Sequence, residues 1–302
     1  AAGVVHATIE KGLTYLDDPE ARAAAIHGDD AEQAYLGLWA LAFNDGPSAG
    51  AQATALLKHP EPGHRFVAVH LLDSLRLPEC EVHLLASLKD PDLRIPTRAL
   101  QKWSRMMDVQ EREDTRWFAP LETLMTRVPK QRTELKPLVW PWTGMAISKD
   151  TVAQAMIKNI GVVSPLRLVP YLTDMDQWTR LHAVRLIVGE KTWDTETRAT
   201  VVGLVGNSSG HVQTEALAAI DRRGTVTPQE AAQIEQLMSR SRGGLRSGVL
   251  TLLIKQSDAD ALASADRLLA AKNAALRVGG LELLRGMVEA KRVPGDCRAR
   301  AE

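Results

Sequence analysis

The sequence has little that marks a compact enzyme or a secreted protein. Only 4% of its 302 residues are aromatic, and it has two cysteines, Cys80 and Cys297, far apart in the chain. Two distant cysteines exclude a disulfide framework and a cysteine-rich metal site. The 37 Lys and Arg residues balance 37 Asp and Glu residues, giving a formal net charge of zero. This balance argues against a surface that is basic throughout and dedicated to nucleic acid or anionic membrane, although a local basic patch stays open.

Signals for secretion or membrane insertion are also missing from the sequence. The first residues, AAGVVHATIEKGL, do not show the basic start, apolar run and cleavage site of a signal peptide. No apolar run approaches the roughly 18 residues that indicate a membrane-spanning helix. We therefore predict a cytoplasmic protein. Because the chain begins without Met and ends on the charged run CRARAE, we expect it to be a piece of something longer.

Motifs that carry catalysis are absent as well. The sequence contains no G-x-S-x-G, H-E-x-x-H, G-x-G-x-x-G or Walker A pattern. We predict no cofactor and no metal, and we expect both cysteines to be structural. Most of the eight histidines are expected in exposed turns. A metal site among His59, His64, His70 and His83 is the alternative. An enzyme of another type stays open but is not favoured.

What the sequence does contain is a repeat. Six segments share one layout, in which an apolar stretch at helical spacing is followed by a polar turn and a second apolar stretch. Prolines and glycines in these turns are the expected helix breakers. The segments are Ala53–Leu75, Val82–Trp103, Leu168–Glu190, Val201–Arg222, Ile234–Gln256 and Ala265–Met287.

One column tests the register of these repeats. The position after the turn is usually basic, and its members are Arg65, Pro96, Arg180, Gln213, Arg246 and Arg277. They lie 31, 84, 33, 33 and 31 residues apart. The long gap predicts one or two degenerate repeats and an insertion between Ser104 and Ser164.

This layout resembles HEAT repeats. In that family an Asp in the turn precedes an Arg of the second helix by six residues, and the two groups bond between neighbouring repeats. Only Asp174 with Arg180 shows the complete pair here, because Asp90 is followed by Pro96 and His59 stands six residues before Arg65. The period is also shorter than usual for this class. The resemblance implies an all-α fold, an α-α superhelix of short HEAT-like helix pairs with an irregular central segment.

The expected domain organisation follows from the interruption. We predict N-terminal repeats over residues 1–103, an irregular insertion over 104–163, and C-terminal repeats over 164–302. Within the insertion, Leu121–Arg127 indicates a short amphipathic helix, and Ser148 with Thr151 three residues later indicates the start of another helix. A helix containing Tyr35 and Trp39 is expected to cap the stack.

A second resemblance concerns only one segment. VWPWTGMAISKDTVAQAMIKNI, Val139–Ile160, is similar to part of large bacterial proteins resembling a molybdate metabolism regulator, which join a WGR module to helical repeats. The resemblance implies one part of a longer chain and no particular chemistry.

Two groups of residues are candidates for binding. Arg240, Arg242 and Arg246 flank a glycine pair ahead of a helix start, an arrangement suited to a phosphate or carboxylate. Arg246 belongs to the repeat column, so a structural role is its alternative. Trp140 and Trp142 are candidates for a protein interface, or they fill the gap left where the repeats are interrupted.

Two functions compete. Stacked helix pairs offer a long concave surface lined by second helices, which suits another protein or another module of the same chain. The favoured prediction is therefore a protein-interaction scaffold. The alternative is nucleic-acid binding in the style of HEAT-like DNA glycosylases, through a basic column that includes Arg180, Arg246 and Arg277. A continuous positive face favours nucleic acid, whereas a face of mixed charge favours protein.

Overall fold

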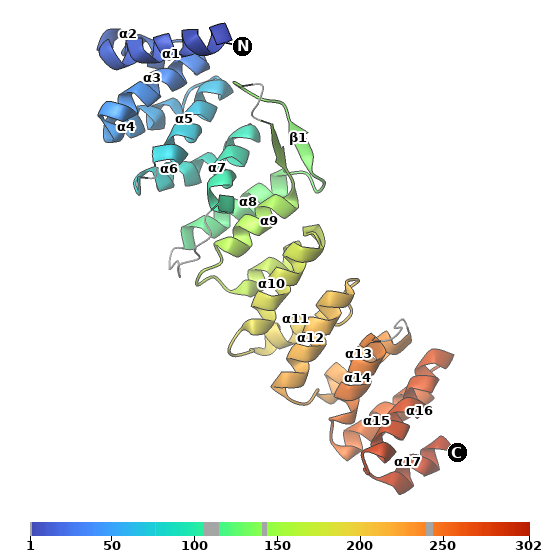
Figure 1. Cartoon of the computed structure of the whole chain (residues 1–302). Helices are drawn as coiled ribbons and strands as arrows, with labels where there is room; N and C mark the ends of the chain where they lie inside the picture. Colours follow the sequence, from blue (N-terminus) through green and yellow to red (C-terminus); the bar gives the residue numbers. More distant parts are fainter. Residues whose placement is uncertain (1, 76, 106–114, 141–143, 240–243) are drawn as a thin grey trace. The chain divides into compact units, whose positions relative to one another are not determined.

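The computed structural model describes residues 2–75, 77–105, 115–140, 144–239 and 244–302 (Figure 1). The chain divides into two compact units, Ala1–Ser164 and Pro165–Glu302. Each unit is described by itself. Among the described residues no helix is both long and apolar enough to cross a bilayer.

Unit 1 is a series of helix pairs. Its helices are α1 (Ala2–Asp17), α2 (Pro19–His27), α3 (Ala31–Asn44), α4 (Gly46–Leu56), α5 (Pro62–Leu75), α6 (Cys80–Ser87), α7 (Arg94–Arg105), α8 (Phe118–Arg127, after the 3-10 turn η1, Thr115–Trp117) and α9 (Lys149–Lys158). Each even-numbered helix from α2 to α8 packs on the helix that follows it. The second members, α3, α5, α7 and α9, also pack on one another in succession, so they form one layer of the unit.

Unit 2 repeats this arrangement. Its elements are η2 (Pro165–Asp174), α10 (Gln177–Gly189), α11 (Thr195–Leu204), α12 (Gly210–Arg223), α13 (Pro228–Glu235) with η3 (Gln236–Ser239), α14 (Gly244–Ile254), α15 (Asp258–Leu269), α16 (Ala274–Glu289) and α17 (Pro294–Ala301). The second helices α10, α12, α14 and α16 contact one another in that order. The predicted all-α, HEAT-like array of helix pairs is thus the fold of this chain.

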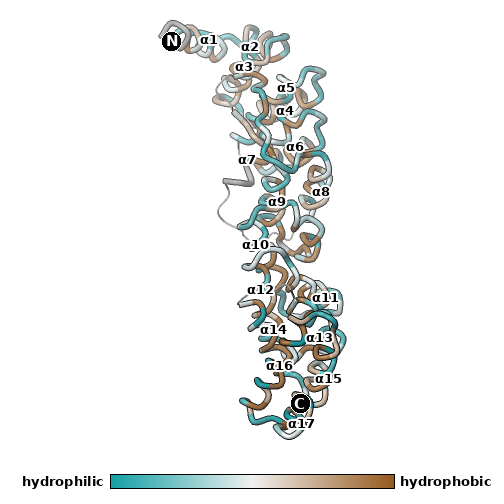
Figure 2. The backbone as a smooth tube through the Cα atoms, turned by 90° about the vertical axis from the view of Figure 1, so that its right-hand side faces the viewer, coloured by the Kyte–Doolittle hydropathy of each residue, from teal (hydrophilic) through white to brown (hydrophobic). Residues whose placement is uncertain are grey.

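The core of each unit lies between its two helix layers. Phe66, Leu71, Leu72 and Phe118 are among the largest fully buried side chains. Figure 2 shows hydrophobic and hydrophilic residues alternating along the helices, as amphipathic packing requires. Burying the apolar stripe against the neighbouring helices is the main force that holds such a repeat together.

Glycines allow two second helices of unit 2 to approach their neighbours closely. A Cβ atom at Gly248 would lie 2.6 Å from the Leu217 side chain, and one at Gly286 would lie 2.5 Å from the Ile254 side chain. Both distances are shorter than carbon–carbon contact permits. A Cβ atom at either position would therefore push the end of the Leu217 or Ile254 side chain aside.

The middle of the chain, where an irregular insertion is predicted over 104–163, contains regular elements. It holds a further helix pair, α8 and α9, and the predicted helix Leu121–Arg127 is part of α8. Ser148 caps α9 by accepting a hydrogen bond from the Thr151 amide at 3.2 Å, as expected. Residues 104–163 therefore belong to unit 1, and the degenerate repeat predicted between Ser104 and Ser164 is this pair.

The connection between α8 and α9 carries a hairpin that an all-α prediction did not include. Strands β1 (Thr133–Leu135) and β2 (Met145–Ile147) pair antiparallel, with Glu134 opposite Ala146. Figure 1 shows the hairpin beside α5 and α7. Strands of three residues are too short to show the alternation by which a strand is recognised in sequence, which explains why they were missed.

Carboxylate caps start many of the helices, and one of them predicts a dependence on pH. Asp194 accepts hydrogen bonds from the Thr197 amide and hydroxyl, both at 2.7 Å. These bonds, the amide first, lower the pKa of the Asp194 carboxyl. Because the folded-state pKa is depressed, the stabilisation is complete above the unfolded value of about 3.9 and is lost as pH falls through the folded-state value.

We therefore expect Asp194→Ala to lower the urea midpoint of unfolding at pH 7. The difference from wild type should shrink as pH falls from about 4 toward 3, because the wild-type cap is then protonated. Glu196→Ala, an exposed position in the same turn, serves as the control. A difference that stays constant between pH 7 and pH 3 would contradict the cap's charge as the cause.

Candidate functional site

The basic column found in the sequence closes the turn of the repeats that carry it. Arg65 Nη1 donates to the carbonyl oxygens of His59 at 2.9 Å and Pro60 at 2.7 Å. Arg277 Nη1 donates in the same way to Ala271 at 3.1 Å and Lys272 at 2.8 Å. These carbonyls belong to the turns that follow α4 and α15. The arginine of the second helix therefore satisfies carbonyl groups of the turn before it.

The other members of the column act alike. Arg180 donates from Nε to Leu172 O and from Nη2 to Met175 O, at 2.7 and 2.8 Å. Gln213 Nε2 donates to Asn207 O at 2.5 Å, so a neutral side chain fills the same role. Arg246 Nη1 donates to Met238 O at 3.1 Å. Five of the six column positions are thus bound to their own turn, and the sixth is Pro96.

An acid–base pair joins neighbouring repeats at one of these turns. Arg65 donates two hydrogen bonds to Asp90 of the next repeat, from Nε to Oδ2 at 2.7 Å and from Nη2 to Oδ1 at 3.1 Å. The hydrogen bond to Asp90 raises the pKa of Arg65, and burial, which lowers it, has the smaller effect. A bond between neighbouring repeats, as in HEAT proteins, is therefore present here. The sequence did not reveal it, because within one repeat Arg65 follows His59 and Asp90 is followed by Pro96.

The complete pair predicted from the sequence, Asp174 with Arg180, lies where η2 is followed by α10. Arg180 is held by the backbone carbonyls of its turn, and the residue that caps α10 is Asp176, whose carboxylate accepts from the Thr179 amide at 2.7 Å. The N-cap of α10 is therefore two residues after Asp174. A bond between Asp174 and Arg180 stays a prediction.

A second group of arginines closes helix ends across one repeat. Arg223, at the end of α12, donates to Lys191 O at 2.6 Å and to Glu190 O beyond α10. Arg292 reaches back to Gln256 O at 2.7 Å and to Ile254 O, and Arg127 reaches Asp90 O and Leu88 O. These residues were not predicted from the sequence, although basic residues at helix ends were a usable signal.

The exposed side chains of the second helices of unit 2 form what we call the second-helix face. It includes Trp178, His182, Arg185, His211, Thr214, Arg222, Arg223, Ser247, Thr251, Lys255, Arg277, Val278, Leu281, Arg285 and Glu289. Half-buried Glu215 and Asp221 of the same helices belong to it as well. Its basic residues have acidic partners in three cases, Arg185–Glu215 at 2.9 Å, Lys255–Asp221 at 2.5 Å and Arg285–Glu289 at 2.7 Å. Half-buried Arg246 pairs with Glu282 at 2.7 Å in the same layer.

Trp140 lies inside the structure of unit 1. It is 7% exposed, and its ring centroid lies 4.7 Å from that of Tyr35, 5.6 Å from that of His70 and 6.3 Å from that of Phe66. Tyr35 Oη and His70 Nδ1 are hydrogen-bonded at 3.1 Å. The segment after β1 thus packs on α3 and α5. This burial favours the gap-filling role for Trp140 over an exposed interface.

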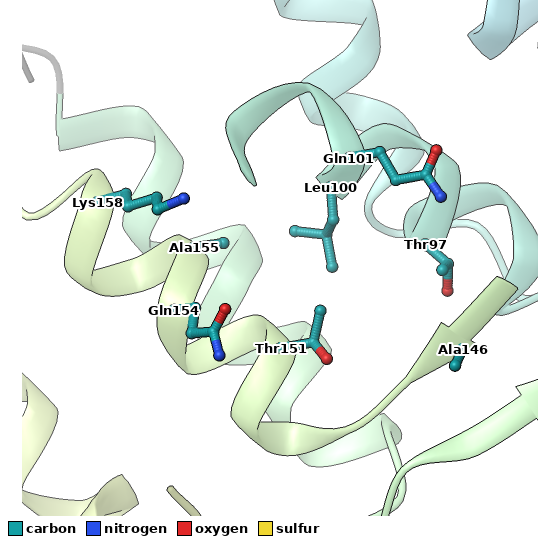
Figure 3. A pocket seen from close by; sticks show the side chains of 8 residues that line it. All are labelled: Thr97, Leu100, Gln101, Ala146, Thr151, Gln154, Ala155 and Lys158. Atoms are coloured by element: carbon teal, nitrogen blue, oxygen red, sulfur yellow. The ribbon is translucent and has the colours of Figure 1, made fainter. Parts of the chain in front are cut away.

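A small groove lies between α7, β2 and α9 (Figure 3). Its lining is mostly uncharged. The lining residues are Thr97, Leu100, Gln101, Ala146, Thr151, Gln154, Ala155 and Lys158. This groove could not be predicted from the sequence because it depends on the hairpin.

The histidines and cysteines form no metal centre in the part of the chain that the structure describes. Both cysteines are buried free thiols. His64 was expected in an exposed turn, but it is only 1% exposed. Its Nε2 is hydrogen-bonded to Gly28 O at 2.9 Å, and its ring centroid lies 3.9 Å from that of His59. Three candidate residues, Trp142, Arg240 and Arg242, lie outside the described residues.

Comparison with known proteins identifies a family. The model of the family of unknown function DUF5724 matches residues 1–301. The chain belongs to DUF5724. No curated protein matches it by sequence.

Two solved structures are similar to this DUF5724 chain at low identity. Escherichia coli YibA is 12% identical with a TM-score of 0.35, over 91% of this chain and 95% of that one. A chain from the complex of CpcE and CpcF of phycocyanin lyase, from Nostoc sp., is 15% identical with a TM-score of 0.36, over 89% and 94%.

The two turn arginines Arg65 and Arg277 make a matched test. Arg65→Met removes the turn bonds and leaves Asp90, whose side chain is 9% exposed, without its guanidinium. We expect a loss of about 3 kcal/mol in the free energy of unfolding. Arg277→Met removes turn bonds of the same kind at an exposed site and should cost about 1 kcal/mol. Urea unfolding measures both, and equal losses would contradict the contribution of the ion pair between repeats.

The burial of Trp140 gives a second test. Trp140→Ala should lower the free energy of unfolding by about 3–5 kcal/mol, because it removes a ring packed on Tyr35, Phe66 and His70 and leaves a cavity. Phe43→Ala, at a ring that is 77% exposed, should cost less than about 0.5 kcal/mol. Urea unfolding followed by circular dichroism measures the difference. If Trp140→Ala is as stable as wild type, the packing role is wrong.

Proposed function

We propose that this DUF5724 chain is a protein-interaction scaffold that binds its partner through the second-helix face. The observation that carries the proposal is the mixed charge of this face. Arg185, Lys255 and Arg285 each lie within 3 Å of a carboxylate oxygen. Bases paired with acids suit the polar groups of a protein surface, and they interrupt the continuous positive band that a phosphate backbone requires.

Exposed apolar side chains on the same helices support the proposal. Trp178 on α10 is 73% exposed, and Val278 and Leu281 on α16 are 49% and 45% exposed. Tryptophan is the side chain most enriched among the residues that dominate binding energy at protein interfaces. Apolar anchors with ion pairs around them are typical of a protein-binding surface.

The alternative, nucleic-acid binding through Arg180, Arg246 and Arg277, has less support. Each of these guanidinium groups already donates to carbonyl oxygens of its own turn. Arg246 also pairs with Glu282 at 2.7 Å, and that carboxylate repels phosphate. Neutralising phosphates needs several cations available at once. The alternative is therefore an outcome of the experiment below.

We also propose a cytoplasmic location, in keeping with the two buried free thiols. The similarity of residues 139–160 to molybdate-metabolism-regulator-like proteins stays a hypothesis and carries no residue role.

The test compares two double variants of the full chain in a quantitative pull-down from nuclease-treated extract of the source organism. Trp178→Ala/Leu281→Ser changes the second-helix face, and Val82→Ser/Val162→Ser changes apolar residues that are 51% and 62% exposed in unit 1. We expect proteins retained by wild type to fall by about tenfold with the first variant, since about 1.4 kcal/mol of lost binding has this effect. The second variant should retain them as wild type does.

The same preparations are tested on 30-nucleotide DNA and RNA at low salt, with Arg277→Glu and with the Arg240→Glu/Arg242→Glu variant. The proposal predicts no binding that changes with these substitutions. Salt-dependent binding that any of them removes would favour the nucleic-acid alternative. Equal protein retention by both double variants would contradict the second-helix face as the binding surface.

A further inference from the structure

Helix α3 has an unusual composition for a helix that reaches the surface. From Ala34 to Phe43 its sequence is AYLGLWALAF, with no charged residue. A helix that is apolar on all sides is normally buried on all sides. In this structure Phe43 is 77% exposed, and Leu36, Trp39 and Leu41 are only half-buried. Part of α3 is therefore less covered than its sequence predicts.

The aromatic side chains of α3 follow one another along the helix at intervals of four residues. The ring centroids of Tyr35 and Trp39 lie 6.1 Å apart, and those of Trp39 and Phe43 lie 6.3 Å apart. The Tyr35 end is covered by Trp140 at 4.7 Å. The Phe43 end is open. We call Tyr35, Trp39 and Phe43 the α3 aromatic strip.

Helix α1, which packs on α3, adds exposed apolar residues of its own. Ile9 and Leu13 lie one turn apart on α1 and are 55% and 54% exposed. Single exposed apolar residues are normal on a surface, whereas several on two adjoining helices mark an interaction site. The uncovered apolar surface is therefore not confined to one side chain.

The charged residues at the two ends of α3 have one sign. No lysine or arginine occurs between Arg22 and Lys58, while Asp29, Asp30, Glu32 and Asp45 fall in that interval. Asp30 and Glu32 stand at the start of α3 and Asp45 directly after its end, and all three are exposed. Hydrogen bonds from Ser48, its hydroxyl first, lower the pKa of Asp45, so this carboxylate is charged at neutral pH.

The acidic character is local, because the formal charge of the chain is zero. Residues 1–50 contain eight acids and two lysine or arginine residues. A partner that carries basic side chains beside apolar ones is therefore attracted to this part of the surface, and one with acidic side chains is repelled. The apolar side chains of the strip do not distinguish a basic amphipathic segment from an acidic one. The local acidic charge favours the basic segment.

We propose that the α3 aromatic strip binds a basic amphipathic helix of a partner protein, with aliphatic residues on Trp39 and Phe43 and lysine or arginine beside Asp30, Glu32 and Asp45. Amphipathic helices commonly bind by laying their apolar face on such a surface. The 14 residues of α3 span about 21 Å, which is the length of a four-turn helix. This site belongs to unit 1 and goes beyond the second-helix face of unit 2.

The probe is a synthetic 14-residue peptide of leucine and lysine at amphipathic helical spacing, and its binding to the full chain is measured by fluorescence anisotropy. Phe43→Ser should raise the Kd by about tenfold or more, as loss of an aromatic anchor does. Val82→Ser, at an apolar residue of α6 that is 51% exposed, should leave the Kd unchanged. Thermal unfolding of both variants should match wild type, since both side chains lie at the surface.

Charge is tested with Glu32→Lys and with a leucine and glutamate peptide of the same spacing. We expect Glu32→Lys to weaken the lysine peptide about threefold to tenfold at low salt and much less at about 1 M salt, because screening removes the attraction. The glutamate peptide should bind weakly to wild type and better to Glu32→Lys. A scrambled lysine peptide, which has no apolar face, should not bind.

Several outcomes would overturn the proposal. Equal Kd values for Phe43→Ser and Val82→Ser would remove the strip as the site, and equal binding of lysine and glutamate peptides would remove the basic partner. Self-association of the chain that Phe43→Ser abolishes and the lysine peptide does not compete with would identify a second copy as the occupant. Trp178 and Leu281 are unchanged in all of these variants, so failure here is distinguishable from failure of the second-helix face.

Discussion

The bond from the second helix to the turn before it is the constraint on which this fold depends. A repeat of about 32 residues has many turns for its length, and carbonyl groups of a packed turn need a donor. Arg65, Arg180, Arg246 and Arg277 each donate to carbonyls of the chain just before their own helix. Arg223 and Arg292 satisfy others across one repeat. Helices of 8 to 16 residues can therefore stack without long capping loops.

The same bonds limit what the surface can do. An arginine that is held by its own turn is a structural group first, so a row of arginines in the sequence is not a row of free cations in the structure. Of the remaining bases on the second helices of unit 2, Arg185, Lys255 and Arg285 have acidic neighbours. This face therefore carries charges of both signs, and the exposed Trp178 and Leu281 supply apolar contact area. These properties favour recognition of protein over recognition of phosphate.

Unit 1 shows how an insertion is absorbed by a repeat. The connection between α8 and α9 forms a hairpin, and the segment after β1 places Trp140 on Tyr35, Phe66 and His70. The inserted chain thus covers one end of the α3 aromatic strip and leaves Phe43 exposed. The inserted segment, which interrupts the repeat pattern in the sequence, thus packs on α3 and α5 through Trp140. This packing determines where the exposed part of the α3 aromatic strip ends.

The sequence by itself determined the helix pairs, their spacing, the start of α9 at Ser148 and the family resemblance, because periodicity and capping are local properties of the chain. It did not determine the partners of its charges. The Arg65–Asp90 bond joins residues 25 positions apart, so a comparison within one repeat showed only Pro96 after Asp90. The burial of Trp140 and His64, the hairpin and the open end of the α3 strip were decided by tertiary structure. Each depends on which distant segment lies against that residue, and spacing along one chain does not record this.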